Sequence, residues 1–88
     1  MIYYVYLIKT LEGYLQKSYV GYTTNFKKRL DKHNSNKGAK STRGYIWHLV
    51  YIKKFYSKNR ALSYEYALKK NRTKRKDLID KFNDTHKK

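Results

Sequence analysis

The sequence has no cysteine, which removes several kinds of chemistry at once. Disulfide bonds, thiolate zinc sites and cysteine nucleophiles are all excluded. The sequence also shows no N-terminal basic-plus-apolar signal segment, and no apolar run approaches the ~20 residues of a membrane span. These absences predict an intracellular protein, in cytoplasm or nucleus, with no membrane partner.

Acidic residues are scarce as well, with 6 Asp and Glu against 22 Lys and Arg and a formal net charge of +16. A positive field of this size opposes self-association and attracts polyanions. Because Lys and Arg supply most non-specific affinity for nucleic acids, a nucleic acid is the expected partner, and a monomer is expected in its absence. So few carboxylates make a two-metal centre hard to assemble, and a one-metal centre is the most they suggest.

The 88 residues are expected to form one domain, spanning residues 1–88. Eleven tyrosines, three phenylalanines and one tryptophan contribute to a hydrophobic fraction of 40%. Disordered basic tails are usually poor in aromatic residues, so this chain is expected to fold.

Three segments have the composition of β-strands. Residues 2–9 are apolar and aromatic at both parities, which predicts a strand covered on both faces. Residues 10–17 contain Gly13 and are predicted to be a hairpin loop, and residues 18–22 are predicted to be the return strand, where Gly21 indicates a bulge or a close approach of backbone. Residues 46–56 are rich in β-branched and aromatic side chains and predict a third strand.

In two other segments the apolar residues recur with the spacing of an α-helix. Residues 23–34 predict a helix capped by Thr24 or Asn25, and residues 58–71 predict a second helix.

The remaining segments complete the predicted fold. Residues 35–44 are polar, basic and punctuated by glycine, which is typical of a loop. Residues 73–83 predict a short C-terminal helix capped by Thr73. The prediction is an α+β domain of order ββαβαα, with a small, mostly antiparallel three-stranded sheet flanked by helices.

Glu65 is unusual because it shares a helical stripe with Ala61, Leu62 and Leu68. A carboxylate on an apolar face is costly unless something pairs with it. It is either in a salt bridge with an arginine or a ligand for a hard divalent cation such as Mg²⁺, which accepts one or two carboxylates plus waters and phosphate oxygens.

Four other side chains are candidates for a functional role. Arg29 and His33 lie four apart and share a helix face, either as surface residues or as groups that bind phosphate and move a proton. Tyr6 and Tyr19 lie on the paired strands, where each tyrosine taken alone is expected to pack. Composition and spacing therefore predict a basic nucleic-acid binder with at most one metal, and leave catalysis open.

Four blocks in order carry a resemblance to a known family. They are YVY at 4–6, YVG at 19–21, FKKRLDKHN at 26–34 and ALSYEYALK at 61–69. Over residues 3–70 the chain resembles the GIY-YIG endonuclease superfamily, most of all the nuclease domain of the Slx-type structure-specific endonuclease and the small stand-alone bacterial domains related to it. Tyr4, Val5 and Val20 depart from the family signature, but its tyrosines are retained. The cysteine-rich zinc domain of the Slx-type enzymes has no counterpart here, so a protein partner for targeting would be a different one.

The resemblance implies a metal-dependent DNA endonuclease that hydrolyses phosphodiester bonds in branched or flapped DNA or nicks duplexes, as in DNA repair or recombination. Tyr6 would activate the attacking water, and Tyr19 would order the site or contact phosphate. Arg29 would steady the scissile phosphate, His33 would assist proton transfer or bind phosphate, and Glu65 would hold one Mg²⁺ or Mn²⁺ ion. Such a base needs its pKa lowered from ~10, and nearby positive charge is expected to lower it.

Lysine, arginine and threonine side chains of the first helix and of the glycine-punctuated loop after it are the candidates for contacts with the DNA backbone, which position a duplex without reading its sequence. They are Lys27, Lys28, Lys37, Lys40, Thr42 and Arg43. A non-catalytic nucleic-acid-binding module remains the alternative, since charge and aromatic content suit it equally. Glu65 separates the two hypotheses, because a binder has no need for a carboxylate that repels phosphate.

Overall fold

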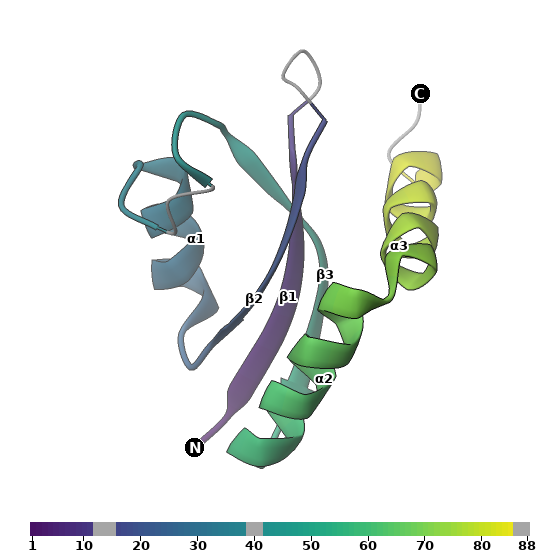
Figure 1. Cartoon of the computed structure of the whole chain (residues 1–88). Helices are drawn as coiled ribbons and strands as arrows, with labels where there is room; N and C mark the ends of the chain where they lie inside the picture. Colours follow the sequence, from purple (N-terminus) through teal and green to yellow (C-terminus); the bar gives the residue numbers. More distant parts are fainter. Residues whose placement is uncertain (12–15, 39–41, 86–88) are drawn as a thin grey trace.

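The structure is a computed structural model that describes residues 1–11, 16–38 and 42–85. Its elements follow the order ββαβαα, which confirms the predicted α+β fold (Figure 1). They are β1 (Tyr3–Thr10), β2 (Ser18–Thr23), α1 (Phe26–Asn34), β3 (Trp47–Phe55), α2 (Lys58–Lys70) and α3 (Arg72–Thr85). None of the helices in these ranges is both long and apolar enough to span a bilayer.

The sheet has the order β2-β1-β3, and both neighbouring pairs are antiparallel. Because β1 is central, its side chains alternate between two covered faces. Val5 and Leu7 point to one face, Tyr6 and Ile8 belong to the packing of the other, and all four are fully buried. This explains why the segment is apolar at both parities, as its sequence predicted.

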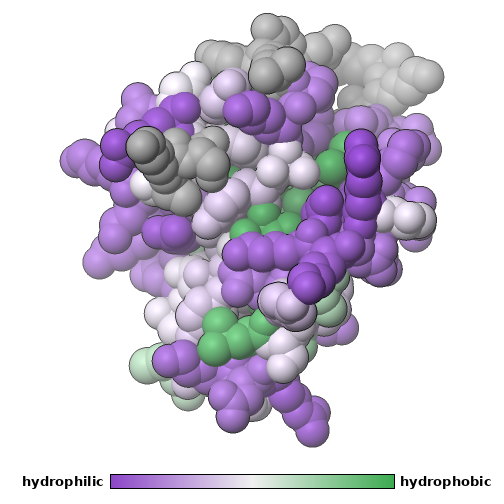
Figure 2. Space-filling model, in the orientation of Figure 1, coloured by the Kyte–Doolittle hydropathy of each residue, from purple (hydrophilic) through white to green (hydrophobic). Residues whose placement is uncertain are grey.

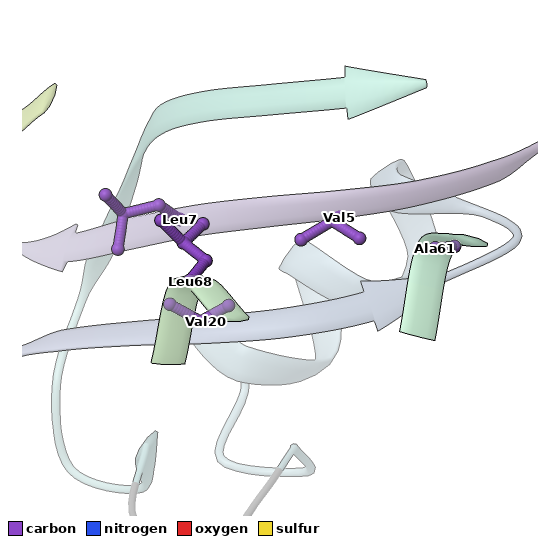
Figure 3. Close-up of a cluster of buried hydrophobic side chains, with 5 residues drawn as sticks. All are labelled: Val5, Leu7, Val20, Ala61 and Leu68. Atoms are coloured by element: carbon purple, nitrogen blue, oxygen red, sulfur yellow. The ribbon is translucent and has the colours of Figure 1, made fainter. Parts of the chain in front are cut away.

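The helices are divided between the two faces of the sheet. In Figure 1, α1 lies on one side of the strands, and α2 and α3 lie on the other. On the α2 side, the buried residues Val5, Leu7 and Val20 meet Ala61 and Leu68, which point from the helix toward the strands (Figure 3). This cluster holds α2 against the sheet, and with it Glu65.

The predicted stripe on α2 is only partly correct. Ala61 and Leu68 are seven residues apart and both are buried, whereas Leu62 is 38% exposed. Leu62 is turned about 100° around the helix from Ala61, which takes it away from the core. Glu65 is partly buried at the margin of the stripe.

Side-chain caps set the helix starts. Asn25, one of the two predicted caps, accepts a hydrogen bond from the Lys28 amide at 3.2 Å and begins α1. The predicted cap at Thr73 is wrong, because Asn71 accepts from the Lys74 amide at 3.0 Å and α3 already begins at Arg72. An asparagine in the short link between two helices takes the capping position, and it leaves Thr73 exposed on the first turn.

Candidate active site

Three polar side chains meet on the face of the sheet that α1 covers. The Tyr6 hydroxyl lies 2.8 Å from Nε2 of His33, and Nε of Arg29 donates to the same hydroxyl at 3.2 Å. Arg29 and His33 are one helical turn apart on α1, so both reach the central strand from one helix face. The structure therefore brings together three of the five residues predicted to carry the chemistry, and Tyr19 lies beside them.

Gly21 makes room for this arrangement. It pairs with Tyr6 across β1 and β2, and a Cβ atom at this position would lie 2.2 Å from the Tyr6 hydroxyl. The tyrosine ring therefore lies against bare backbone, which is the close approach that the glycine indicated. Its β2 neighbour Tyr19 shares this face, with its ring centroid 5.0 Å from that of His33 and 6.4 Å from that of Tyr6.

The Arg29 guanidinium fixes one hydrogen bond of the cluster, because it can only donate and the Tyr6 hydroxyl therefore accepts from it. The Tyr6 hydroxyl donates to Nε2 of His33 in one imidazole tautomer and accepts from it in the other. A neutral imidazole that accepts at Nε2 carries its proton on Nδ1. Nδ1 lies 2.9 Å from Oγ1 of Thr42, which completes a line of hydrogen bonds from Arg29 to the loop after α1.

Burial controls the ionisation of the two central groups. It raises the pKa of Tyr6 to about 12, more than the hydrogen bond and the charge of Arg29 lower it. Burial also lowers the pKa of His33 to about 4, and the positive charge of Arg29 acts in the same direction. The expected lowering of the Tyr6 pKa is therefore wrong for the protein without substrate, because loss of hydration outweighs the neighbouring cation.

Access to the cluster is unequal. Tyr6 and His33 are fully buried, whereas Arg29 is partly exposed. In this conformation Arg29 can reach a phosphate outside the protein and His33 cannot. The alternative role of His33 in binding phosphate is therefore not supported, and its role in proton transfer remains a prediction.

Acid should unfold the protein partly through His33. The folded state holds this imidazole neutral down to a pKa of about 4, while in the unfolded chain it takes up a proton near 6.5. The stabilising difference is complete above pH 6.5 and is lost as pH falls toward 4, amounting to up to roughly 3 kcal/mol. Denaturant unfolding at pH 7 and pH 4.5 should show His33→Gln losing less stability on acidification than wild type. The exposed His48 provides the comparison, because His48→Gln makes the same chemical change outside the buried cluster.

Glu65 stands apart from the cluster, on α2. Its Oε2 lies 3.5 Å from Nζ of Lys69, and its side chain is 19% exposed. The predicted salt bridge is thus present, but its partner is a lysine one turn along the same helix rather than an arginine. The charge of Glu65 reaches Tyr6 electrostatically, where it makes a small upward contribution to the pKa.

Few of the described side chains could ligate a metal ion. In residues 1–11, 16–38 and 42–85 there is no group of three or more His, Asp or Glu side chains that could enclose an ion. A single carboxylate with solvent access suits Mg²⁺, which keeps most of its waters and takes further oxygens from a phosphate substrate. Glu65 therefore fits as the one protein ligand of such an ion, and no protein-only metal cage is formed by the described residues.

The predicted DNA contacts divide into three groups. Lys27, Lys28, Lys37 and Arg43 are exposed and available to phosphate. Lys40 lies outside the described residues. Thr42 is fully buried, with its hydroxyl at His33 and its carbonyl accepting from Nε1 of Trp47 at 3.0 Å. The prediction that Thr42 contacts phosphate is therefore not supported. Thr42 stands among basic residues in the sequence, but its side chain faces the interior.

Sequence reasoning also missed residues that support the site. A Cβ atom on Gly38 would lie 2.6 Å from Nδ1 of His33, so only glycine allows the loop to pass there. The Asn34 side chain accepts from the Trp47 amide at 2.7 Å and donates to its carbonyl at 3.3 Å, which ties the end of α1 to β3. The glycine was visible in the sequence, but nothing local showed that its neighbour would be a buried histidine.

An α+β domain that combines a buried tyrosine–histidine pair, an accessible arginine and a helix carboxylate has the groups that a nuclease needs. Residues 2–78 match the family described as GIY-YIG catalytic domain, and the chain belongs to this family. Membership supports a nuclease function and hence a nucleic-acid substrate. It also confirms the resemblance seen in the sequence blocks.

Several small proteins are similar to this chain. The UPF0213 protein OB0043 of Oceanobacillus iheyensis is 42% identical over 67 residues, which cover 75% of this chain and 74% of that protein. A UPF0213 protein of Streptococcus pneumoniae serotype 4 is 40% identical over 75 residues, which cover 84% of this chain and 73% of that one. The solution NMR structure of the UPF0213 protein BH0048 from Bacillus halodurans aligns with a TM-score of 0.53 at 40% identity, over 91% of this chain and 84% of that chain.

Proposed function

We propose that this protein is a metal-dependent DNA endonuclease that hydrolyses phosphodiester bonds, with branched or flapped DNA among its substrates. One observation carries the proposal. Arg29, partly exposed, is hydrogen-bonded to the Tyr6 hydroxyl, which in turn contacts the imidazole of His33. A phosphate held by Arg29 therefore lies next to the Tyr6 hydroxyl, through which a proton can pass to His33.

Arg29 binds the scissile phosphate. Its bond to Tyr6 uses one of five N–H donors and fixes the guanidinium. The remaining donors are available to two phosphate oxygens at once. A fixed cation at this point stabilises the negative charge that grows on phosphorus as water attacks.

Tyr6 and His33 carry the proton away from the attacking water. This step requires a water molecule to reach the Tyr6 oxygen in the complex with DNA, because the residue is fully buried in the free protein. The Tyr6 oxygen then takes a proton from that water while its own hydroxyl proton passes to Nε2 of His33. The hydroxide bonds to phosphorus, one P–O ester bond breaks, and the leaving oxygen takes a proton from solvent. Because the two transfers are coupled, no free tyrosinate has to form, which matters for a phenol whose pKa is about 12.

Glu65 is the proposed ligand of one Mg²⁺ or Mn²⁺ ion, with its carboxylate released from Lys69. A bound ion of this kind would supply Lewis acidity that stabilises the leaving oxygen. Lys69 is half exposed and its ion pair is a surface contact of small energy, so the carboxylate is easily freed.

Exposed lysine and arginine side chains are proposed to position the DNA. Lys27 and Lys28 lie on the helix that carries Arg29, and Lys37 and Arg43 lie in the loop beside it. On the face shown in Figure 2, hydrophilic residues cover most of the surface and hydrophobic ones gather in small areas. Such a surface suits backbone contacts that do not read sequence.

Cleavage of a panel of labelled DNAs tests the proposal. Duplex, flap, fork and four-way-junction substrates are incubated with the protein in Mg²⁺ or Mn²⁺, and binding is measured in parallel. Cleavage is expected with either metal, and EDTA should abolish it while binding persists. Binding to every substrate without cleavage of any would favour the non-catalytic binding module instead.

A further inference from the structure

The buried threonine in the loop after α1 faces the active-site histidine from the side opposite Tyr6. Oγ1 of Thr42 lies 2.9 Å from Nδ1, while Nε2 faces the tyrosine hydroxyl at 2.8 Å. Both rotatable hydroxyls and the imidazole are fully buried, so water does not compete for these bonds. The contact between Nδ1 and Thr42 therefore influences which of the two ring nitrogens carries the hydrogen.

We propose that Thr42 is a positioning residue that keeps the proton of His33 on Nδ1, so that Nε2 stays free to accept the proton of Tyr6. The proposal rests on the proposed nuclease function. Thr42 accepts the Nδ1 proton and so selects the tautomer in which the basic nitrogen faces the reaction. In the other tautomer Nε2 already carries a hydrogen and cannot receive one from Tyr6.

The surrounding contacts hold Thr42 in place for this task. Its carbonyl accepts a hydrogen bond from Nε1 of Trp47. The backbone of Trp47 is in turn hydrogen-bonded to the side chain of Asn34, which follows His33 in the sequence. Trp47 thus links the threonine to the helix that carries the histidine, through one buried hydrogen bond to Thr42 and two partly buried ones to Asn34. Gly38 closes the remaining side of the imidazole, because a side chain there would overlap Nδ1.

The hydrogen bonds of Tyr6 disfavour the alternative proton arrangement. If Thr42 donated to Nδ1, Nε2 would carry the hydrogen and point it at the Tyr6 oxygen, which already accepts from Arg29. The hydroxyl of Tyr6 would then accept twice and have to send its own hydrogen elsewhere in a fully buried position. In the arrangement in which Thr42 accepts, Tyr6 donates to Nε2 and Nδ1 donates to Thr42. The hydrogen still to be placed is then that of the Thr42 hydroxyl, and Thr42 has an interaction beyond those with His33 and Trp47.

The tautomer can be observed directly, without substrate. In long-range ¹H–¹⁵N spectra of the whole protein, the wild type should show a protonated Nδ1 and an unprotonated Nε2 for His33. Thr42→Val, which keeps the shape and removes the hydroxyl, should shift the proton toward Nε2, and Thr42→Ser should keep the wild-type pattern. Thr73→Val on the exposed surface of α3 is the matched control and should change nothing.

Kinetics then test the consequence. Thr42→Val should lower kcat for the best DNA substrate by about 10- to 100-fold with KM nearly unchanged, and Thr42→Ser should restore most of the rate. A wild-type spectrum with a protonated Nε2 would overturn the proposal, even if Thr42→Val failed to fold. Equal rate losses in the valine and serine variants would also overturn it. A wild type with the expected tautomer that cleaves no DNA would contradict the nuclease function alone, leaving the role of Thr42 in fixing the histidine supported.

Discussion

Replacing Glu65 with glutamine should lower the rate of DNA cleavage by about 10³-fold, equivalent to about 4 kcal/mol. Glutamine keeps the size of the side chain and removes the charge that a divalent cation requires. The ion pair with Lys69 is also lost, but a pair of this exposure contributes little to folding. DNA binding should persist or tighten slightly, since the change removes a negative charge.

A matched control is available on α3. Asp80 is also a helix carboxylate paired with a lysine one turn away, with Oδ2 3.0 Å from Nζ of Lys76. Asp80→Asn makes the same change of net charge and should leave cleavage unaltered. Rates for both variants are compared by single-turnover cleavage at several Mg²⁺ concentrations.

The sign of the electrostatic effect on Tyr6 makes this test specific. The negative charge of Glu65 raises the pKa of Tyr6, so its removal would favour loss of the phenolic proton. If Glu65 acted on the reaction only through Tyr6, Glu65→Gln would preserve or increase the rate. A large decrease would therefore indicate a direct role such as metal binding, and an unchanged rate would end the one-metal proposal.

Replacing Tyr6 with phenylalanine should decrease cleavage by about 10²- to 10⁴-fold. The hydroxyl joins Arg29 to His33, so its loss breaks the proton path and releases the guanidinium from its fixed position. Stability should also fall by about 1–3 kcal/mol, because a buried imidazole nitrogen is left without its hydrogen bond. Affinity for DNA should change little, since Tyr6 is fully buried.

Tyr64 provides the comparison for this variant. It lies on α2 across the sheet, its hydroxyl is 2.9 Å from that of Tyr51, and burial likewise raises its pKa to about 12. Tyr64→Phe removes a similar hydrogen bond and should affect stability without affecting cleavage. Thermal melts and single-turnover rates separate the two effects, and equal cleavage by Tyr6→Phe and wild type would sink the proposed proton path.

The fold was largely predictable because its signals are local. The apolar run of β1 at both parities showed that this strand is covered on both faces, and all four of its central residues are buried. Asn25 was recognisable as a cap, whereas Thr73 was not distinguishable from the true cap Asn71, which stands two residues earlier. Either residue type can accept a helix-start hydrogen bond, and only the path of the chain decides which does.

The sequence predicted that Tyr6, Arg29 and His33 lie together, but it did not predict their ionisation. The spacing of Arg29 and His33 placed both on one face of α1, and the order of the family blocks indicated Tyr6 as their partner. The direction of the Tyr6 pKa was predicted wrongly, because the sequence shows the neighbouring charge but not the depth of burial. Loss of hydration is a property of the packed protein, and here it is the larger effect.

The sequence by itself determined the charge that attracts nucleic acid, the absence of cysteine chemistry, the succession of strands and helices and the family of the protein. These depend on residue type and short-range periodicity, which are visible in one dimension. Only the tertiary structure decided that Thr42 faces inward to His33 and that Gly21 admits the ring of Tyr6. Each contact joins residues that are separated in the sequence and meet only when the chain folds.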